Sequence, residues 1–325
     1  TSEIIANTAH RAAYIADLYM TVARENGLKS EQVKFIHRPS QELAIVDPDG
    51  EDQNNLTGKV DVVVLDHELF DPGLIGKGVL AKVNHLKKKI TTANHLIVPM
   101  GAQVFCAPCE IICPRGDGPD GLDWRVGDET RWAAFYETAN LDGLLREPWR
   151  CLGPVNEVFE FDFTEPEVKL SGQTDLTFTV KEDGVLNSIV FWYKLALTAD
   201  VELDHTPTEL RDAKSPAVRG DYNRQATQWL AAPMEVSKGD EIQVRASYSR
   251  SRIRFEVTKP EASKKDRGVG CPRWLFLRSW DEERVDAFRK AIDKALEKIM
   301  EAREQIPKLD RPPLRIVHMG AGLGQ

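Results

Sequence analysis

The sequence has no excess of positive charge and no long hydrophobic run, and each absence excludes a class of protein. The formal net charge of the 325 residues is −8, whereas proteins that bind nucleic acid through phosphate contacts are usually basic. No stretch of the sequence reaches the roughly 18 to 20 consecutive apolar residues that a membrane-spanning helix needs. We therefore expect neither nucleic acid nor membrane among the binding partners.

Cysteine is also scarce, and its five residues are an odd number. This usage is typical of a reducing compartment rather than of a disulfide framework, so we expect a cytoplasmic or nuclear protein. Three of the five follow the pattern Cys106-x2-Cys109-x3-Cys113, which fits either a metal or redox site or a pair of strands rich in small apolar residues. Because no histidine or fourth cysteine is close by, the strands are favoured and no metal site is predicted.

The N-terminal part of the sequence has the pattern of an α/β region. Residues 11–26 carry apolar side chains at helical spacing, and Gly27 follows where a C-terminal cap is expected. Strands are predicted at 33–37, 60–65 and 95–98, and a second helix at 79–90. This order is typical of the second half of a nucleotide-binding domain. The first strand, its glycine turn and the next strand are not evident at this end.

Beyond about residue 98 the pattern changes to that of an antiparallel β domain. Strands are predicted at 155–163, 175–180, 188–197 and 241–247, with glycine-containing turns between them. We expect a barrel or a sandwich that ends near Val257. Residues 260–270 are polar and charged, which predicts a linker, and residues 281–305 have the spacing of a long amphipathic helix.

The last residues combine a strand with a glycine turn. Residues 314–319 are predicted to form a buried strand, and Gly320, Gly322 and Gly324 follow it in the run Gly-Ala-Gly-Leu-Gly. Such a turn lets the backbone approach a nucleotide closely, and it normally opens a dinucleotide- or S-adenosylmethionine-binding fold. Here it follows the β domain instead of opening the α/β region.

Three short stretches resemble a known family. Residues 62–78, VVVLDHELFDPGLIGKG, resemble the strand and acidic loop of the protein arginine methyltransferases, most closely of the type III branch, which carries two tandem modules and monomethylates arginine. Residues 158–163, VFEFDF, resemble the entry to that family's β-barrel, and residues 226–229, ATQW, resemble its Thr-His-Trp loop.

The resemblance covers residues 5–257 and implies an α/β plus all-β fold. It implies a partial Rossmann-like S-adenosylmethionine-dependent methyltransferase domain at 1–98, followed by an antiparallel β-barrel for substrate binding and dimerisation at 99–258. Residues 259–325 would then contain the linker, the amphipathic helix and the first strand and glycine loop of a second or permuted module.

The resemblance also assigns catalytic positions. The family's acidic loop holds the substrate guanidinium between two glutamates, which orient its nitrogen toward the methyl group. Glu68 stands at the first position, but Lys77 stands at the second, where its ammonium would repel the substrate cation and could pair with Glu68. Gln228 replaces the family's histidine, and Trp229 is retained as a wall of the arginine channel. The alternatives are that Lys77 points to solvent and that Trp229 is an ordinary core residue.

For the cofactor, the resemblance assigns S-adenosylmethionine to Gly320, Gly322, Gly324, Ser40 and Gln41. The Ser-Gln pair, assigned to adenine, fits a polar surface turn as well. Two architectures are compatible with a glycine loop so far from this pair: a fragment of a tandem protein, or a circular permutant whose terminal strand inserts beside the N-terminal helix. The fragment is favoured, because a histidine falls where the ribose-binding acid is expected.

Two functions follow from the resemblance. The first is a protein arginine N-methyltransferase that transfers a methyl group from S-adenosylmethionine to arginine in a protein, weakened or inactivated by Lys77. The alternative is a catalytically silent scaffold, or pseudoenzyme, of the same fold that supports an active methyltransferase partner. Either function implies a dimer or a tandem pseudo-dimer, and residues 114–146 are the candidate dimerisation arm.

Overall fold

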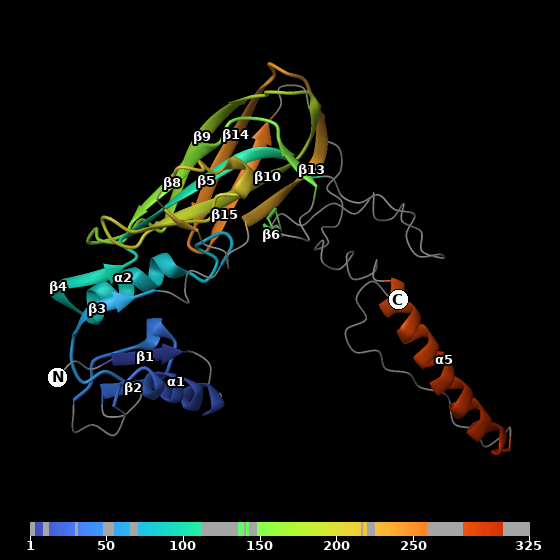
Figure 1. Ribbon diagram of the computed structural model, residues 1–325, viewed down its shortest axis with the longest axis horizontal. Coiled ribbons are helices and arrows are strands. Elements are labelled where there is room, and N and C mark those ends of the chain that lie inside the picture. The colour runs from blue at the N-terminus through green and yellow to red at the C-terminus, as the bar shows by residue number, and fades with distance from the viewer. Residues whose placement is uncertain are drawn as a thin grey trace.

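The protein is a mixed α/β and all-β structure, as the sequence predicts. The computed structural model describes residues 4–8, 13–29, 32–47, 55–65, 71–111, 136–139, 141–142, 148–215, 217–219, 225–258 and 282–307. The α/β elements lie beside one end of a curled antiparallel sheet, and a long C-terminal helix stands apart from both (Figure 1). The predicted linker, the strand at 314–319 and the glycine loop lie outside the described residues.

The α/β part consists of two parallel strand pairs and two helices. In chain order its elements are β1 (Ile4–Thr8), α1 (Ala13–Glu25), β2 (Val33–His37), β3 (Val60–Val64), α2 (Val79–Lys89) and β4 (Thr91–Val98). β1 pairs with β2, and β3 pairs with β4. The sequence predicted no strand before the first helix, and this prediction was wrong, because β1 lies there. β1 is only five residues long and ends in Asn-Thr, so its pairing with β2 rather than its own pattern defines it.

Helix α2 joins the α/β part to the β domain. Its buried side chains, Val79, Leu80, Val83 and Leu86, recur at helical spacing on one face. From the same helix, the Asn84 amide exchanges two hydrogen bonds of 2.8 Å with the backbone of Val168. The Lys87 ammonium donates to the carbonyl of Phe163 at 2.9 Å. The helix therefore contacts the connection around residues 163–168, between two strands of the β domain, through polar as well as apolar side chains.

The β domain contains an eight-stranded sheet and a three-stranded sheet. The larger sheet is formed by β5 (Gly101–Ile111), β6 (Glu137–Ala139), β7 (Trp149–Cys151), β8 (Asn156–Asp162), β10 (Gly184–Ala196), β11 (Glu202–Asp204), β12 (Val218–Arg219) and β13 (Gln225–Val236). The smaller one is formed by β9 (Ser171–Thr179), β14 (Glu241–Ser249) and β15 (Arg252–Thr258). β10 lies between β5 and β13. Strict alternation of exposed and buried side chains along β14 shows that one face of the smaller sheet is covered.

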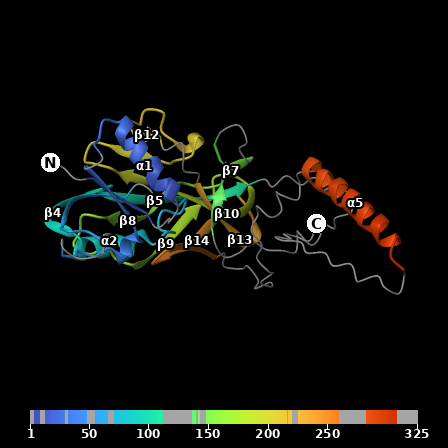
Figure 2. The same cartoon turned by 90° about the horizontal axis from the view of Figure 1, so that it is seen from below.

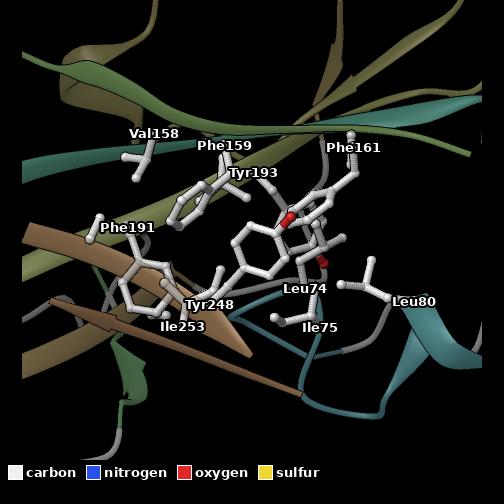
Figure 3. Close-up of a cluster of buried hydrophobic side chains, with 14 of the residues drawn as sticks. Leu74, Ile75, Leu80, Val158, Phe159, Phe161, Phe191, Tyr193, Tyr248 and Ile253 are labelled. Carbon is white, nitrogen blue, oxygen red and sulfur yellow. The ribbon is translucent and has the colours of Figure 1, made fainter. Parts of the chain in front are cut away.

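The two faces of β10 contribute to two hydrophobic clusters. The inner cluster lies between the sheets, and it includes Phe159, Phe161, Phe191, Tyr193 and Tyr248 of the barrel together with Leu74, Ile75 and Leu80 of the α/β part (Figure 3). The outer cluster contains Ala107, Cys109, Ile111, Ala139, Leu141, Val190, Trp192 and Trp229. Because the inner cluster takes side chains from both parts, the α/β part and the barrel share one core.

The C-terminal helix α5 (Glu282–Glu304) forms where the sequence predicts an amphipathic helix. Figure 2 also shows it away from the barrel. Its apolar residues Ile292, Ile299 and Met300 are exposed. Among the helices that the structure describes, none combines the length and the apolar composition needed to cross a membrane.

Candidate functional site

The second half of the predicted acidic loop, residues 71–78, is a compact turn that closes around Asp71. The Asp71 carboxylate accepts a hydrogen bond of 2.9 Å from the backbone N–H of Gly73, and its carbonyl accepts one of 2.8 Å from Leu74. A side chain at Gly76 would collide with the Asp71 carboxylate, so the turn requires glycine there. Glu68, the first predicted catalytic glutamate, lies outside the described residues.

Tyr136 holds this turn against the barrel. Its hydroxyl donates to Asp71 Oδ1 at 2.6 Å, and its ring covers Gly73 so closely that a Cβ atom at that glycine would collide with it. The same ring packs edge-on against Phe191 of β10, with the ring centroids 5.3 Å apart. Burial, followed by the hydrogen bond to Asp71, raises the pKa of Tyr136, so the hydroxyl keeps its proton.

Sequence reasoning missed this Asp71–Tyr136 contact, which joins residues 65 positions apart. The local signal for half of it was present, because Asp71-Pro72-Gly73 is a typical turn sequence within the acidic loop. Nothing in the sequence around Tyr136 indicates its partner.

Lys77 lies between two glycines at the start of α2, and its side chain is exposed. The following residue, Gly78, has a φ of 73°, a left-handed conformation that favours glycine. The glycines on either side of Lys77 therefore set the backbone conformation at this point of the turn.

Gln228 and Trp229 do not converge on one site. The residues predicted as a Thr-His-Trp-like loop are part of strand β13, and the correction follows from their antiparallel pairing with β10. Successive side chains of a strand point to opposite faces. Trp229 accordingly packs in the outer cluster with Trp192, whereas Gln228 faces the smaller sheet.

The Gln228 amide is held by the backbone of Phe255 in β15. Its Nε2 donates to the Phe255 carbonyl at 2.6 Å, and its Oε1 accepts from the Phe255 N–H at 2.8 Å. No strand ladder joins β13 to β15 in the part of the chain that the structure describes. Gln228 therefore ties the eight-stranded sheet to the edge of the three-stranded one.

Ser40 and Gln41 form the 3-10 turn η2 (Ser40–Glu42) directly after β2. Ser40 is half-buried and Gln41 is exposed. The next residue, Leu43, is buried, and its carbonyl lies 3.0 Å from His85 Nε2 of α2. The turn is therefore anchored at the carboxyl end of a parallel strand, where α/β proteins commonly bind ligands. Gly320, Gly322 and Gly324 lie outside the described residues.

The structure favours strand packing for the cysteine cluster. Cys106 packs in the inner cluster and Cys109 in the outer one, on opposite faces of β5. Side chains on opposite faces of a strand do not bind one metal ion. Within the described residues there is no group of three or more histidine, cysteine or acidic side chains placed to hold a metal. Cys113 lies outside them.

Comparison with known proteins finds arginine methyltransferases among both the relatives and the structural neighbours. The chain is 24% identical to "Protein arginine N-methyltransferase 1.6" of Arabidopsis thaliana, over 75% of this chain and 35% of that protein. It is 23% identical to "Arginine N(omega)-methyltransferase" of Streptomyces achromogenes, over 75% of this chain and 62% of that protein. It is 21% identical to "Protein arginine N-methyltransferase 7" of Danio rerio, over 74% of this chain and 36% of that protein.

The chain thus spans between about a third and three fifths of the length of these curated relatives. A solved structure described as "Trypanosoma brucei PRMT1 enzyme-prozyme heterotetrameric complex with AdoHcy" has the same fold. Its TM-score is 0.52 at 17% identity, over 76% of this chain and 71% of that one. No family model matches the chain.

Proposed function

We propose that the chain is the acceptor-binding part of a protein arginine N-methyltransferase whose catalytic grip on the substrate is weakened by Lys77. The cofactor is S-adenosylmethionine, which supplies an electrophilic methyl group when bound. The acceptor is an arginine side chain of another protein. The proposal rests on the turn at residues 71–78. This turn is closed by Asp71 and packs against Tyr136, although Lys77 stands where the resemblance places a catalytic glutamate.

The chemistry requires a guanidinium nitrogen aimed at the methyl group, which is chiefly a matter of position and charge. Asp71 and Tyr136 are positioning residues in this proposal, because they hold the turn at residues 71–78 that carries Lys77. Lys77 would place a positive charge beside the substrate cation. At about 4 Å separation two like charges repel by about 4 kcal/mol near a protein surface.

A catalytically silent partner subunit is the second candidate, and two observations favour it. Lys77 is exposed, and the Gln228 amide is engaged with the Phe255 backbone instead of being available to a substrate. The structural neighbour from Trypanosoma brucei is an enzyme–prozyme complex, so a fold of this kind is compatible with a non-catalytic subunit. This role predicts association with an active methyltransferase.

The experiment has two parts, performed on the whole 325-residue chain. Calorimetric titration with S-adenosylmethionine or its demethylated product tests cofactor binding, and saturation at one site per chain supports the methyltransferase. The Lys77→Glu variant is then assayed for methyl transfer to an arginine- and glycine-rich peptide. We expect at least a tenfold gain over the unchanged chain, since one like-charge repulsion is removed.

Lys59→Glu is the matched control, because it makes the same charge change at an exposed lysine before the start of β3. Cofactor binding without any gain in Lys77→Glu would favour the silent partner. Absence of cofactor binding would contradict an active enzyme in this chain. It would then favour the fragment of a tandem protein over the circular permutant.

A further inference from the structure

Cys109 and Cys151 face each other across the strands β5 and β7. They are direct partners in the antiparallel register. The N–H of Leu152 donates to the carbonyl of Pro108 at 2.9 Å, so Pro108 and Leu152 are a hydrogen-bonded pair. Pairs alternate along an antiparallel ladder, which makes the cysteines a non-hydrogen-bonded pair.

The spacing of such a pair suits a disulfide. In non-hydrogen-bonded pairs the Cα atoms are about 4.5 Å apart and the side chains are at their closest. Disulfides span Cα separations of about 4.4 to 6.8 Å. The register therefore places the two Cα atoms at a spacing that a disulfide can span. Both cysteines are free thiols in the structure.

The two thiols differ in access and in charge. Cys109 is fully buried in the outer cluster, and its burial raises the pKa of its thiol. Cys151 is only partly buried. The hydrogen bond from Cys109, against the opposing effect of burial, lowers the pKa of Cys151 to about 7. In the structure the protonated Cys151 thiol donates to the carbonyl of Gly153 at 3.0 Å. Cys151 is thus the less buried of the two residues and its thiol ionises first, and Cys109 is its fully buried neighbour.

Neither sulfur belongs to the proposed methyl-transfer site. Both lie at the outer cluster, whereas the turn at residues 71–78 packs into the inner one. The 41 residues between the two cysteines include Tyr136, which docks that turn. A covalent link between β5 and β7 would fix both ends of the segment that carries this tyrosine.

We propose that Cys109 and Cys151 are a dithiol site that reacts with small disulfides such as oxidised glutathione and forms an intramolecular disulfide between β5 and β7. In the first step the Cys151 thiolate attacks one sulfur of oxidised glutathione. A mixed disulfide forms, and the released glutathione thiolate takes up a proton. In the second step the Cys109 sulfur attacks the Cys151 sulfur, and the proton of Cys109 passes to the second departing glutathione.

The electrons balance in this sequence of steps. Two protein thiols are oxidised to one disulfide, and one glutathione disulfide is reduced to two thiols. The second step needs no solvent access to Cys109, because the sulfur that it attacks is already its neighbour.

The test treats the whole chain with defined ratios of reduced to oxidised glutathione, quenches with acid, alkylates the remaining thiols and maps the peptides by mass spectrometry. We expect Cys109 and Cys151 to lose their thiols together, to appear in one linked peptide pair and to return to thiols with dithiothreitol. The rate should rise with pH through about 7, as the thiolate of Cys151 forms. The oxidised chain should melt at a higher temperature, because the disulfide lowers the conformational entropy of the unfolded chain.

Three variants make the test decisive. Cys109→Ala should stop at a stable mixed disulfide on Cys151, Cys151→Ser should give no linked pair, and Cys106→Ala should form the same linked pair as the unchanged chain. A mixed disulfide that persists in the unchanged chain would overturn the proposal, as would a link from Cys151 to another cysteine. Circular dichroism of each variant before oxidation ensures that folded protein is compared.

Discussion

At the scale of single residues, three side-chain amides each make the pair of hydrogen bonds that a neighbouring strand makes in a ladder. Each one donates to the carbonyl and accepts from the N–H of a single distant residue, so it imitates a peptide group. The pairs are Asn84 with Val168, Asn187 with Ile111 and Gln228 with Phe255. One of them, Asn187, lies at the register shift in the β10–β13 ladder.

Replacing Gln228 with alanine should destabilise the barrel. The change leaves the N–H and the carbonyl of Phe255 without partners, and water does not replace them because that residue is only 2% exposed. We expect a loss of about 3 kcal/mol in the free energy of unfolding, measured by urea denaturation. Gln243→Ala, at an exposed position of β14, is the control and should change stability by less than about 0.5 kcal/mol. Equal losses in the two variants would contradict the role of the amide.

His205 should make the stability depend on pH. Burial lowers the pKa of His205 from 6.5 to about 4, against the opposing effects of the Tyr193 carbonyl and of Asp204. The unfolded chain therefore binds more protons between these two values. The stabilisation is complete above pH 6.5 and is lost as the pH falls toward 4.

Between about pH 7.5 and pH 5, the unchanged chain should lose about 2 kcal/mol more stability than His205→Gln does. Urea denaturation at the two pH values measures the difference. Gln243→Ala, at an exposed position of β14, removes no titratable group and is the control that should follow the unchanged chain. Parallel pH curves for the unchanged chain and His205→Gln would contradict the assignment.

At the scale of elements, the acidic loop owes its conformation to a contact from another part of the chain. The turn at residues 71–78 is closed by Asp71 and covered by Tyr136, which is next to β6 in the sequence. Arg252 lies near enough to oppose the rise in the pKa of that tyrosine. The turn at residues 71–78, Tyr136 and Arg252 at the start of β15 therefore lie close together.

Tyr136→Phe should loosen this turn without unfolding the protein. The phenylalanine ring still packs on Phe191, but the hydroxyl no longer donates to Asp71. We expect faster hydrogen exchange at residues 73–75 and a loss of about 1 to 2 kcal/mol in stability, because the hydrogen bond joins a hydroxyl to a carboxylate. Tyr248→Phe is the control, since the Tyr248 ring is buried against Phe159 and Phe161. Unchanged exchange at residues 73–75 in Tyr136→Phe would contradict the docking role.

At the scale of the whole molecule, the α/β part and the barrel share one hydrophobic cluster, so we expect them to unfold together. Leu74, Ile75 and Leu80 lie among the barrel aromatics (Figure 3). The turn that belongs to the proposed catalytic loop is therefore also a piece of the core, and its position depends on the packing of both parts.

Ile75→Ala should consequently destabilise both parts together. The residue is fully buried, so its truncation removes apolar contacts and leaves a cavity, at a cost of about 2 to 4 kcal/mol. Hydrogen exchange should show faster global opening in α2 and in β10 to the same extent. Ile45→Ala, at a position 39% exposed, is the control. Opening that is confined to α2 would show that the two parts fold separately.

Local patterns in the sequence by themselves determined most of the regular elements and the order of the fold. Helical spacing of apolar residues defines α1, α2 and α5, and alternation defines β14. These patterns are local because a helix or strand exposes a fixed face at every third or fourth, or every second, position. The same patterns, with the resemblance of residues 62–78, indicate the fold that the chain shares with its structural neighbour.

Only the tertiary structure decided which residues meet. It placed the short strand β1 beside β2, turned Gln228 and Trp229 to opposite faces, and brought Tyr136 to Asp71. It also set Cys109 opposite Cys151, a pair that depends on the register of β7 against β5. Gln228 and Phe255 are 27 positions apart in the sequence, and Tyr136 and Asp71 are 65 positions apart. Periodicity within one element shows which face is buried, but it does not show which distant element covers that face.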